Sequence, residues 1–109
     1  MADHLLVAIS NALPGREDEY GTWYETVHMP EVLALPGFVA ARRFAPAKAP
    51  ADGPSRCMAV YEIEGDADAA MGELMNAVRV GTFNMSDAID GKTVDMVLYT
   101  ATTPRITAR

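Results

Sequence analysis

Two segments of this chain carry apolar side chains at nearly every position, and this feature constrains the fold most. Residues 4–10 and 93–100 have the length of strands, and both place apolar residues at odd and at even positions. A strand with one face in water normally alternates apolar and polar residues. Because these two strands do not alternate, the sheet that contains them needs cover on both faces.

The rest of the sequence predicts two more strands and two helices. Strands are expected at residues 38–45 and 56–63, separated by an exposed hairpin loop at 46–55 that is rich in proline. Apolar residues recur at three and four positions after Arg16, and again after Asp66, a typical N-cap residue. The order β-α-β-β-α-β predicts an α+β fold with a four-stranded antiparallel sheet and both helices on one face.

The sequence also predicts where the first helix ends. Proline disfavours helical geometry in the residue before it, so Pro30 predicts that the regular helix stops near His28. A short turn through Leu35 is expected to follow. Pro36 and Gly37 then lead into the second strand.

Two helices can cover only one face of this sheet. We therefore expect residues 1–109 to form one domain that pairs with a second copy, as a homodimer. The alternative is a monomer whose second face tolerates exposed aliphatic side chains. Residues 101–109 show no periodicity, and they are expected either to be mobile or to contact the partner.

Charge and composition exclude several classes of partner. The net charge is −6, and Arg42-Arg43 is the only cluster of basic residues, so no nucleic-acid partner is expected. No apolar run reaches the roughly 18 residues of a membrane span. One cysteine and two histidines without paired spacing predict no disulfide and no metal site. We expect a cytoplasmic protein.

Residues 23–44, WYETVHMPEVLALPGFVAARRF, resemble the dimeric α/β-barrel superfamily, most closely its EthD-like branch. In that family a helix that ends in a histidine, a Pro-Gly-Phe turn and a strand that closes on Arg-Phe follow one another. The resemblance implies a ferredoxin-like homodimer whose two sheets form a barrel, with a ligand cleft between the helices and the sheet of each subunit. Members include cofactor-free oxygenases, isomerases, cyclases, decarboxylases, haem-degrading enzymes and proteins without assigned activity, so the fold does not select a reaction.

His28 is the first candidate for chemistry, because the resemblance places it in that cleft. An imidazole moves protons readily near neutral pH. Tyr24 and Glu25 lie four and three residues earlier, where one could act as an acid and the other could orient the ring. The alternative is a structural histidine that caps the helix C-terminus.

Other side chains are candidates for substrate binding. Trp23 and Tyr24 could hold a flat apolar ligand, although the same aromatic stripe would also make an ordinary core. Tyr61 and Tyr99 could place hydroxyl groups in the cleft, depending on strand register. Asn11 could bond a ligand oxygen, although a role in the adjoining turn is the stronger interpretation.

The arginines and the cysteine leave alternatives open. Arg42 and Arg43 point to opposite faces of their strand, so one of them needs a carboxylate partner or a ligand anion. Glu62 on the neighbouring strand is the expected structural partner, and Arg43 is retained as a substrate-binding candidate. Cys57 is interpreted as a packed thiol.

Together these features favour an enzyme without organic cofactor or metal. It would use His28 as general base or acid on a small hydrophobic, oxygenated substrate such as an aromatic, a lactone or a polyketide. The reaction would be an isomerisation, cyclisation, elimination or decarboxylation. The alternatives are a cofactor-free or haem-related monooxygenase and a dimer that binds a small ligand without catalysis.

Overall fold

A computed structural model describes residues 3–48 and 56–109. Most of the hairpin loop predicted at residues 46–55 therefore lies outside the described residues. The elements, in chain order, are β1 (His4–Ala12), α1 (Glu17–Trp23), the π-helical turn η1 (Tyr24–His28), α2 (Met29–Leu33), β2 (Phe38–Phe44), β3 (Cys57–Ile63), α3 (Ala67–Arg79) and β4 (Ile89–Thr100). This order confirms the predicted β-α-β-β-α-β arrangement.

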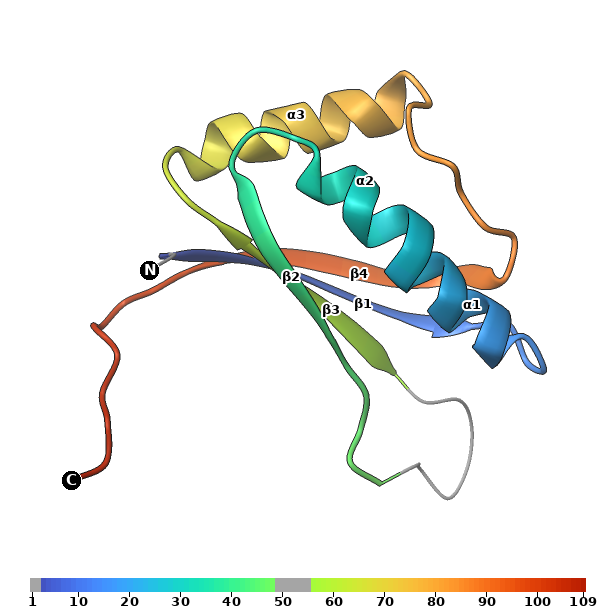
Figure 1. Cartoon of the computed structure of the whole chain (residues 1–109), viewed down its shortest axis with the longest axis horizontal. Coiled ribbons are helices and arrows are strands. Elements are labelled where there is room, and N and C mark those ends of the chain that lie inside the picture. Colours follow the sequence, from blue (N-terminus) through green and yellow to red (C-terminus); the bar gives the residue numbers. More distant parts are fainter. Residues whose placement is uncertain (1–2, 49–55) are drawn as a thin grey trace.

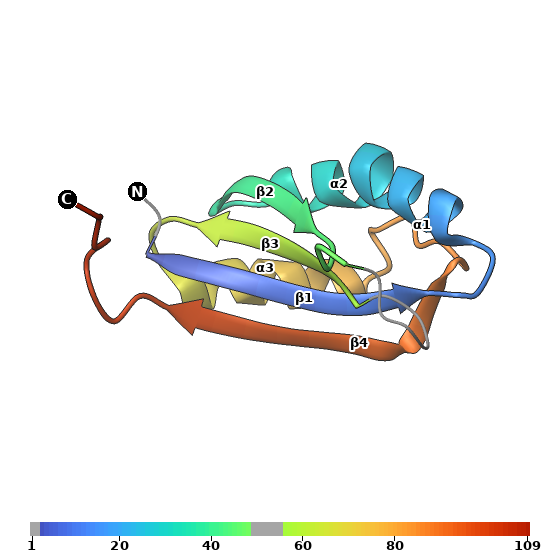
Figure 2. The same ribbon diagram turned by 90° about the horizontal axis from the view of Figure 1, so that it is seen from below.

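The four strands form one antiparallel sheet in the order β2-β3-β1-β4. The helices all lie on one face of it (Figure 1), and the opposite face is left bare of helices (Figure 2). The predicted fold class is confirmed. In the part of the chain that the structure describes, no helix is long and apolar enough to cross a membrane.

The core lies between the sheet and the helices. Alternate residues of the central strands, among them Leu6 of β1 and Tyr61 of β3, face the helices and are almost fully buried. The helix α3 begins at the predicted cap, where the Asp66 carboxylate accepts a bond from the Ala69 N–H. Gly37 has a φ of +92°, and a Cβ there would lie 3.0 Å from the Cβ of Ala70, so only glycine fits this turn.

The prediction that the first helix ends near His28 is wrong. The chain continues as a helix through the π turn to Leu33, and the Met29 N–H bonds the carbonyl of Tyr24, five residues earlier. Pro30 then falls in the first turn of α2, where a missing N–H costs least. The wider turn before it also relieves the contact that a proline ring makes with the preceding turn of an α-helix.

Two strands are longer than the sequence pattern predicts. β1 continues through Asn11 to Ala12, and these residues pair with Ile89 and Asp90 after a bulge beyond Ile9. Asn11 is therefore a strand residue rather than a turn residue. Its N–H donates to the Thr93 hydroxyl, which holds the bulge in place.

The helix-free face of the sheet, here called the open face, carries apolar side chains of β1 and β4, as the strand pattern predicts. Strand register places Leu5, Val7 and Ile9 of β1 beside Val97 and Tyr99 of β4 on this face. Leu5, Val97 and Tyr99 are 37%, 41% and 54% exposed. The homodimer that would cover this face remains a prediction. Residues 101–109 are exposed and run away from the body of the molecule (Figure 1).

Candidate functional site

A cavity of about 260 Å³ lies between the helices and the sheet, on the β4 side. Leu6 and Ala8 of β1 form its floor, and aromatic side chains of α1, η1 and β3 form one wall. Half-exposed apolar residues of α3 and β4, including Val78 and Met96, surround it on the other side. None of its lining residues carries a charge at neutral pH when His28 is unprotonated. This location agrees with the cleft that the resemblance implies.

His28 lines the cavity and is held by three aromatic rings. Its imidazole stacks on the Trp23 indole, with ring centroids 4.7 Å apart and an angle of 19° between the planes. Tyr24 and Phe83 contact it edge-on, at 5.3 and 5.4 Å. The Nδ1 atom is buried and has no hydrogen-bond partner among the described residues. The ring is therefore fixed in position, yet one of its polar atoms is unsatisfied.

The surroundings of His28 keep its ring neutral. Burial lowers its pKa below the ordinary value of 6.5, and the negative charge of Glu31 opposes this effect only in part. At pH 7 the imidazole is therefore unprotonated and able to accept a proton. This state is the one that a general base needs.

The prediction that Glu25 orients His28 is wrong. Glu25 pairs instead with Arg43, at 3.2 Å between carboxylate oxygen and guanidinium nitrogen. The π turn explains the difference, because it takes more residues per turn than an α-helix and so rotates Glu25 away from His28. Tyr24, four residues before His28, keeps its ring against the imidazole.

Two tyrosines that line the cavity are hydrogen-bond donors rather than bases. Burial raises the pKa of Tyr24 to about 12 and also raises the pKa of Tyr61, so both stay protonated at neutral pH. Tyr61 is 2% exposed, and its hydroxyl has no hydrogen-bond partner among the described residues. The structure brings Trp23, Tyr24, His28 and Tyr61 together as lining residues of this cavity.

Three of the predicted site residues do not line this cavity. Tyr99 pairs with Leu5 and lies on the open face, on the opposite side of the sheet from His28. Asn11 is buried at the bulge, and its side-chain oxygen has no partner among the described residues. Arg43 faces the helices but lies against other side chains, as described next.

Arg43 is held by a structural cluster. Its guanidinium lies over the rings of Tyr20 and Tyr24, at 5.6 and 5.4 Å from their centroids, besides its ion pair with Glu25. The predicted partner Glu62 is wrong, because Glu62 pairs with Leu5 in register and so lies on the open face. The positive charge of Arg43 is thereby directed away from the cavity.

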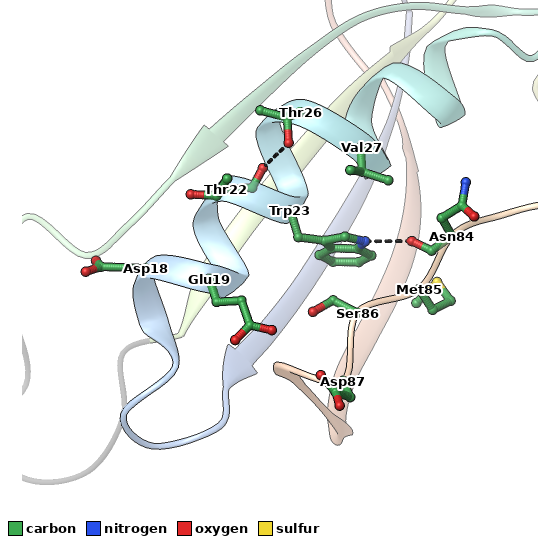
Figure 3. Close-up of a pocket in the computed structure, with 10 residues that line it drawn as sticks. All are labelled: Asp18, Glu19, Thr22, Trp23, Thr26, Val27, Asn84, Met85, Ser86 and Asp87. Carbon is green, nitrogen blue, oxygen red and sulfur yellow. Dashed lines mark hydrogen bonds between the residues drawn. The ribbon is translucent and has the colours of Figure 1, made fainter.

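The loop between α3 and β4 supplies lining residues that the sequence analysis did not identify. Phe83 and Met85 line the cavity, and Asn84 between them is bonded to Trp23, the last residue of α1, and to Glu31 of α2. The Trp23 indole N–H donates to the Asn84 carbonyl at 2.7 Å (Figure 3). The Asn84 N–H and side-chain amide donate to the Glu31 carboxylate at 2.9 to 3.2 Å. We call this arrangement the Asn84 clamp.

An open groove of about 860 Å³ lies outside the clamp, between α1 and residues 84–87 (Figure 3). Trp23 and Met85 line both this groove and the cavity. Its acidic residues include Glu19 and Asp87, and Arg16 forms ion pairs with both of them. Within residues 3–48 and 56–109, no group of three or more potential ligands could hold a metal ion.

The sequence matches no protein-family model and no curated protein. Three solved structures resemble it in fold. A Bacillus cereus protein, provisionally assigned as an antibiotic biosynthesis monooxygenase, has a TM-score of 0.64 and 12% identity, over 98% of this chain and 100% of that one. An EthD family protein from Bacillus halodurans has a TM-score of 0.61 and 14% identity, over 88% and 96%. The chain has the ferredoxin-like fold of these α/β proteins.

A third structure, from Shewanella loihica, is provisionally assigned as a monooxygenase. It has a TM-score of 0.51 and 13% identity, over 95% of this chain and 99% of that one. All three identities are at a level that shows the fold alone, and a shared fold does not establish a shared reaction.

A haem group does not fit the cavity. Pockets for drug-sized molecules have volumes of roughly 300–1,000 Å³, and a porphyrin is a large molecule on that scale. The 260 Å³ beside His28 lies below this range, and three aromatic rings already contact the imidazole, one stacked on it and two edge-on. The residues around His28 therefore do not fit the haem-related alternative.

Proposed function

We propose that this protein is a cofactor-independent monooxygenase that acts on a small, apolar, oxygenated substrate, with His28 as the base. The observation that carries the proposal is the neutral, partly buried imidazole of His28, whose buried Nδ1 atom has no partner among the described residues and which lines a mostly apolar cavity. Unsatisfied buried polar atoms are uncommon, and they often mark positions where a ligand supplies the missing bond.

The first step is removal of a proton from the substrate. With its own proton on Nε2, the imidazole accepts a hydroxyl proton at Nδ1. The Tyr61 hydroxyl, which stays protonated because burial raises its pKa, donates to the oxygen that becomes negative. The apolar walls exclude water and so strengthen both interactions.

The second step is the reaction of the electron-rich phenolate with O₂. A phenol and O₂ give a quinone and water: one oxygen atom enters the ring, and the other leaves as water. A C–O bond forms at one ring carbon, and the C–H bond of that carbon and the O–O bond break. The two ring carbons that bear oxygen in the quinone are oxidised, and O₂ is reduced by four electrons. The ring C–H supplies one proton of the water that leaves. The protonated His28 returns its proton to the departing oxygen, so the base ends the cycle as it began.

The similar structures support oxygenation rather than another proton-transfer reaction. Two of the three are provisionally assigned as monooxygenases, and the third belongs to the EthD family. A second candidate follows from the same base, because a proton shuttle at His28 also serves an isomerase, cyclase, lyase or decarboxylase. Such a reaction would need no O₂.

We also propose that a second copy of the chain covers the open face. Exposed apolar side chains there are Leu5 of β1 and Val97 and Tyr99 of β4. Patches of this kind commonly mark protein interfaces. The His28 cavity lies on the other face of the sheet, so pairing would leave it accessible.

Turnover of substituted phenols under air with ¹⁸O₂, and again under argon, tests the reaction. We expect one ¹⁸O atom per product, no turnover under argon, and a loss of about 100-fold or more in His28→Gln. His4→Gln is the matched control, because His4 bonds Thr100 and does not line the cavity. Equal rates under argon would establish the isomerase or lyase candidate, and an active His28→Gln would reject His28 as the base.

A further inference from the structure

We infer that the His28 cavity selects uncharged aromatic molecules of one or two rings that carry a hydroxyl group, and that it rejects carboxylates and three-ring systems. This inference rests on the proposed function only in taking the occupant of the cavity as the substrate. Size, charge and the pairing of polar atoms each support it separately.

The volume sets the number of rings. A buried apolar cavity of about 150 Å³ is sufficient to bind benzene. The cavity beside His28, at about 260 Å³, is less than twice that size. It therefore has room for a substituted single ring or two fused rings, but its volume is too small for three rings.

The charge of the walls excludes ionised ligands. No lysine, arginine, aspartate or glutamate lines the cavity. The nearest candidates are already engaged, since Arg43 pairs with Glu25 and Glu31 holds Asn84. A bound carboxylate would lose its hydration and gain no ionic partner, which is strongly unfavourable in apolar surroundings.

The polar atoms specify a hydroxyl group. Of the polar side-chain atoms in the lining, His28 Nδ1 and the Tyr61 hydroxyl are buried without a partner, whereas the Trp23 N–H is already bonded to Asn84. With the imidazole proton on Nε2, as proposed above, Nδ1 is an acceptor, and the Tyr61 hydroxyl is a donor. A ligand hydroxyl can donate to Nδ1 and accept from Tyr61, whereas a carbonyl satisfies only Tyr61 and a hydrocarbon neither.

The shape of the walls favours a flat ligand. Trp23 and His28 form a nearly parallel stack, and Phe83 meets the same imidazole edge-on. An aromatic ring can continue this arrangement of offset and edge contacts, whereas a saturated chain cannot. Met85 and Met96 at the cavity border have flexible side chains that can adapt to a substituent.

Isothermal titration calorimetry under argon with five probes tests the inference on the wild-type protein. We expect 4-ethylphenol and 2-naphthol to bind, and ethylbenzene to bind about 10-fold more weakly because two buried polar atoms stay unpaired. No binding is expected for 4-ethylbenzoate, which adds a charge, or for 9-phenanthrol, which adds a ring. Tyr61→Phe should lower the affinity for 4-ethylphenol about 10-fold and leave the affinity for ethylbenzene unchanged.

Equal affinity for 4-ethylphenol and ethylbenzene would overturn the hydroxyl assignment, and binding of 4-ethylbenzoate or 9-phenanthrol would overturn the charge or size argument. These outcomes are separate from those for the proposed function, because binding under argon requires no chemistry. Selective binding without turnover in air would reject the monooxygenase and keep the ligand class. Oxygenation of a carboxylate substrate in air would keep the monooxygenase and reject the ligand class.

Discussion

The change Tyr61→Phe should stabilise the ligand-free protein, which is unusual for a substitution in a core. Tyr61 is 2% exposed, and its hydroxyl has no hydrogen-bond partner among the described residues. A buried polar group without a partner costs about 1–3 kcal/mol. Phenylalanine keeps the ring and removes only the unsatisfied oxygen, so the free energy of unfolding should rise by about 1–2 kcal/mol.

Tyr20→Phe is the matched control for this change. Tyr20 is also 2% exposed, but its hydroxyl lies 2.6 Å from the Ser10 hydroxyl. Removing it leaves Ser10, itself buried, without that partner, so Tyr20→Phe should lower the free energy of unfolding by about 1–2 kcal/mol. The same chemical change at two equally buried tyrosines should therefore have opposite signs.

Urea unfolding, followed by circular dichroism and by the fluorescence of Trp23, measures both changes. Thermal midpoints should move by about 4–8 °C per kcal/mol in a domain of this size, upward for Tyr61→Phe and downward for Tyr20→Phe. A loss of stability in Tyr61→Phe comparable to that in Tyr20→Phe would refute the reasoning. It would mean that the Tyr61 hydroxyl has a stabilising partner and is not held ready for a ligand.

Three further predictions concern His28, the Asn84 clamp and the open face. Because burial lowers the pKa of His28, the unfolded chain binds its proton more readily, and the protein should lose stability as pH falls below about 6.5. Urea unfolding at pH 5 and at pH 7.5 measures this loss as a difference in the free energy of unfolding. His28→Gln should reduce that difference, and a difference equal to that of the wild-type protein would contradict the prediction. Glu31→Ala removes the carboxylate that holds Asn84, so amide hydrogen exchange of residues 83–86 should accelerate about 10-fold. An unaltered exchange rate would show that the clamp does not order the loop. Val97→Lys should shift sedimentation from dimer to monomer, whereas Met75→Lys, on an exposed side of α3, should not.

The sequence was sufficient to predict the sheet and the helix layer. The length and composition of the apolar runs locate the strands, and Asp66 and Gly37 mark a helix start and a turn whose geometry the structure confirms. Strand ends were predicted less well. Asn11 reads as a turn residue in the sequence because the bulge that keeps it in β1 depends on pairing with β4, a contact distant along the chain.

The candidate site was predictable only where local spacing decides it. Trp23, Tyr24 and His28 lie on one continuous helical unit, and they meet in the structure as expected. The π turn was not predictable, because it follows from packing around Pro30, and it sends Glu25 to Arg43 instead of His28.

Register and loop contacts account for the remaining differences. Tyr61 and Tyr99 were indistinguishable from the pattern, since a shift of one residue in register exchanges the two faces of a strand. Phe83 and Met85 reach the cavity through the Asn84 clamp, which joins residues 53 positions apart. The only local signal for this contact is Phe83, the single aromatic residue of the loop.

The central claim is that His28 presents a neutral acceptor nitrogen to an uncharged hydroxyl ligand, and ¹⁵N NMR of the labelled histidine side chains tests it most directly. At pH 7 the ring of His28 should be neutral, with its proton on Nε2, and saturating 4-ethylphenol should shift the Nδ1 resonance as that atom gains a hydrogen bond. Ethylbenzene should produce no comparable shift. A protonated Nδ1, or an Nδ1 resonance that 4-ethylphenol leaves unchanged at saturation, would contradict the account.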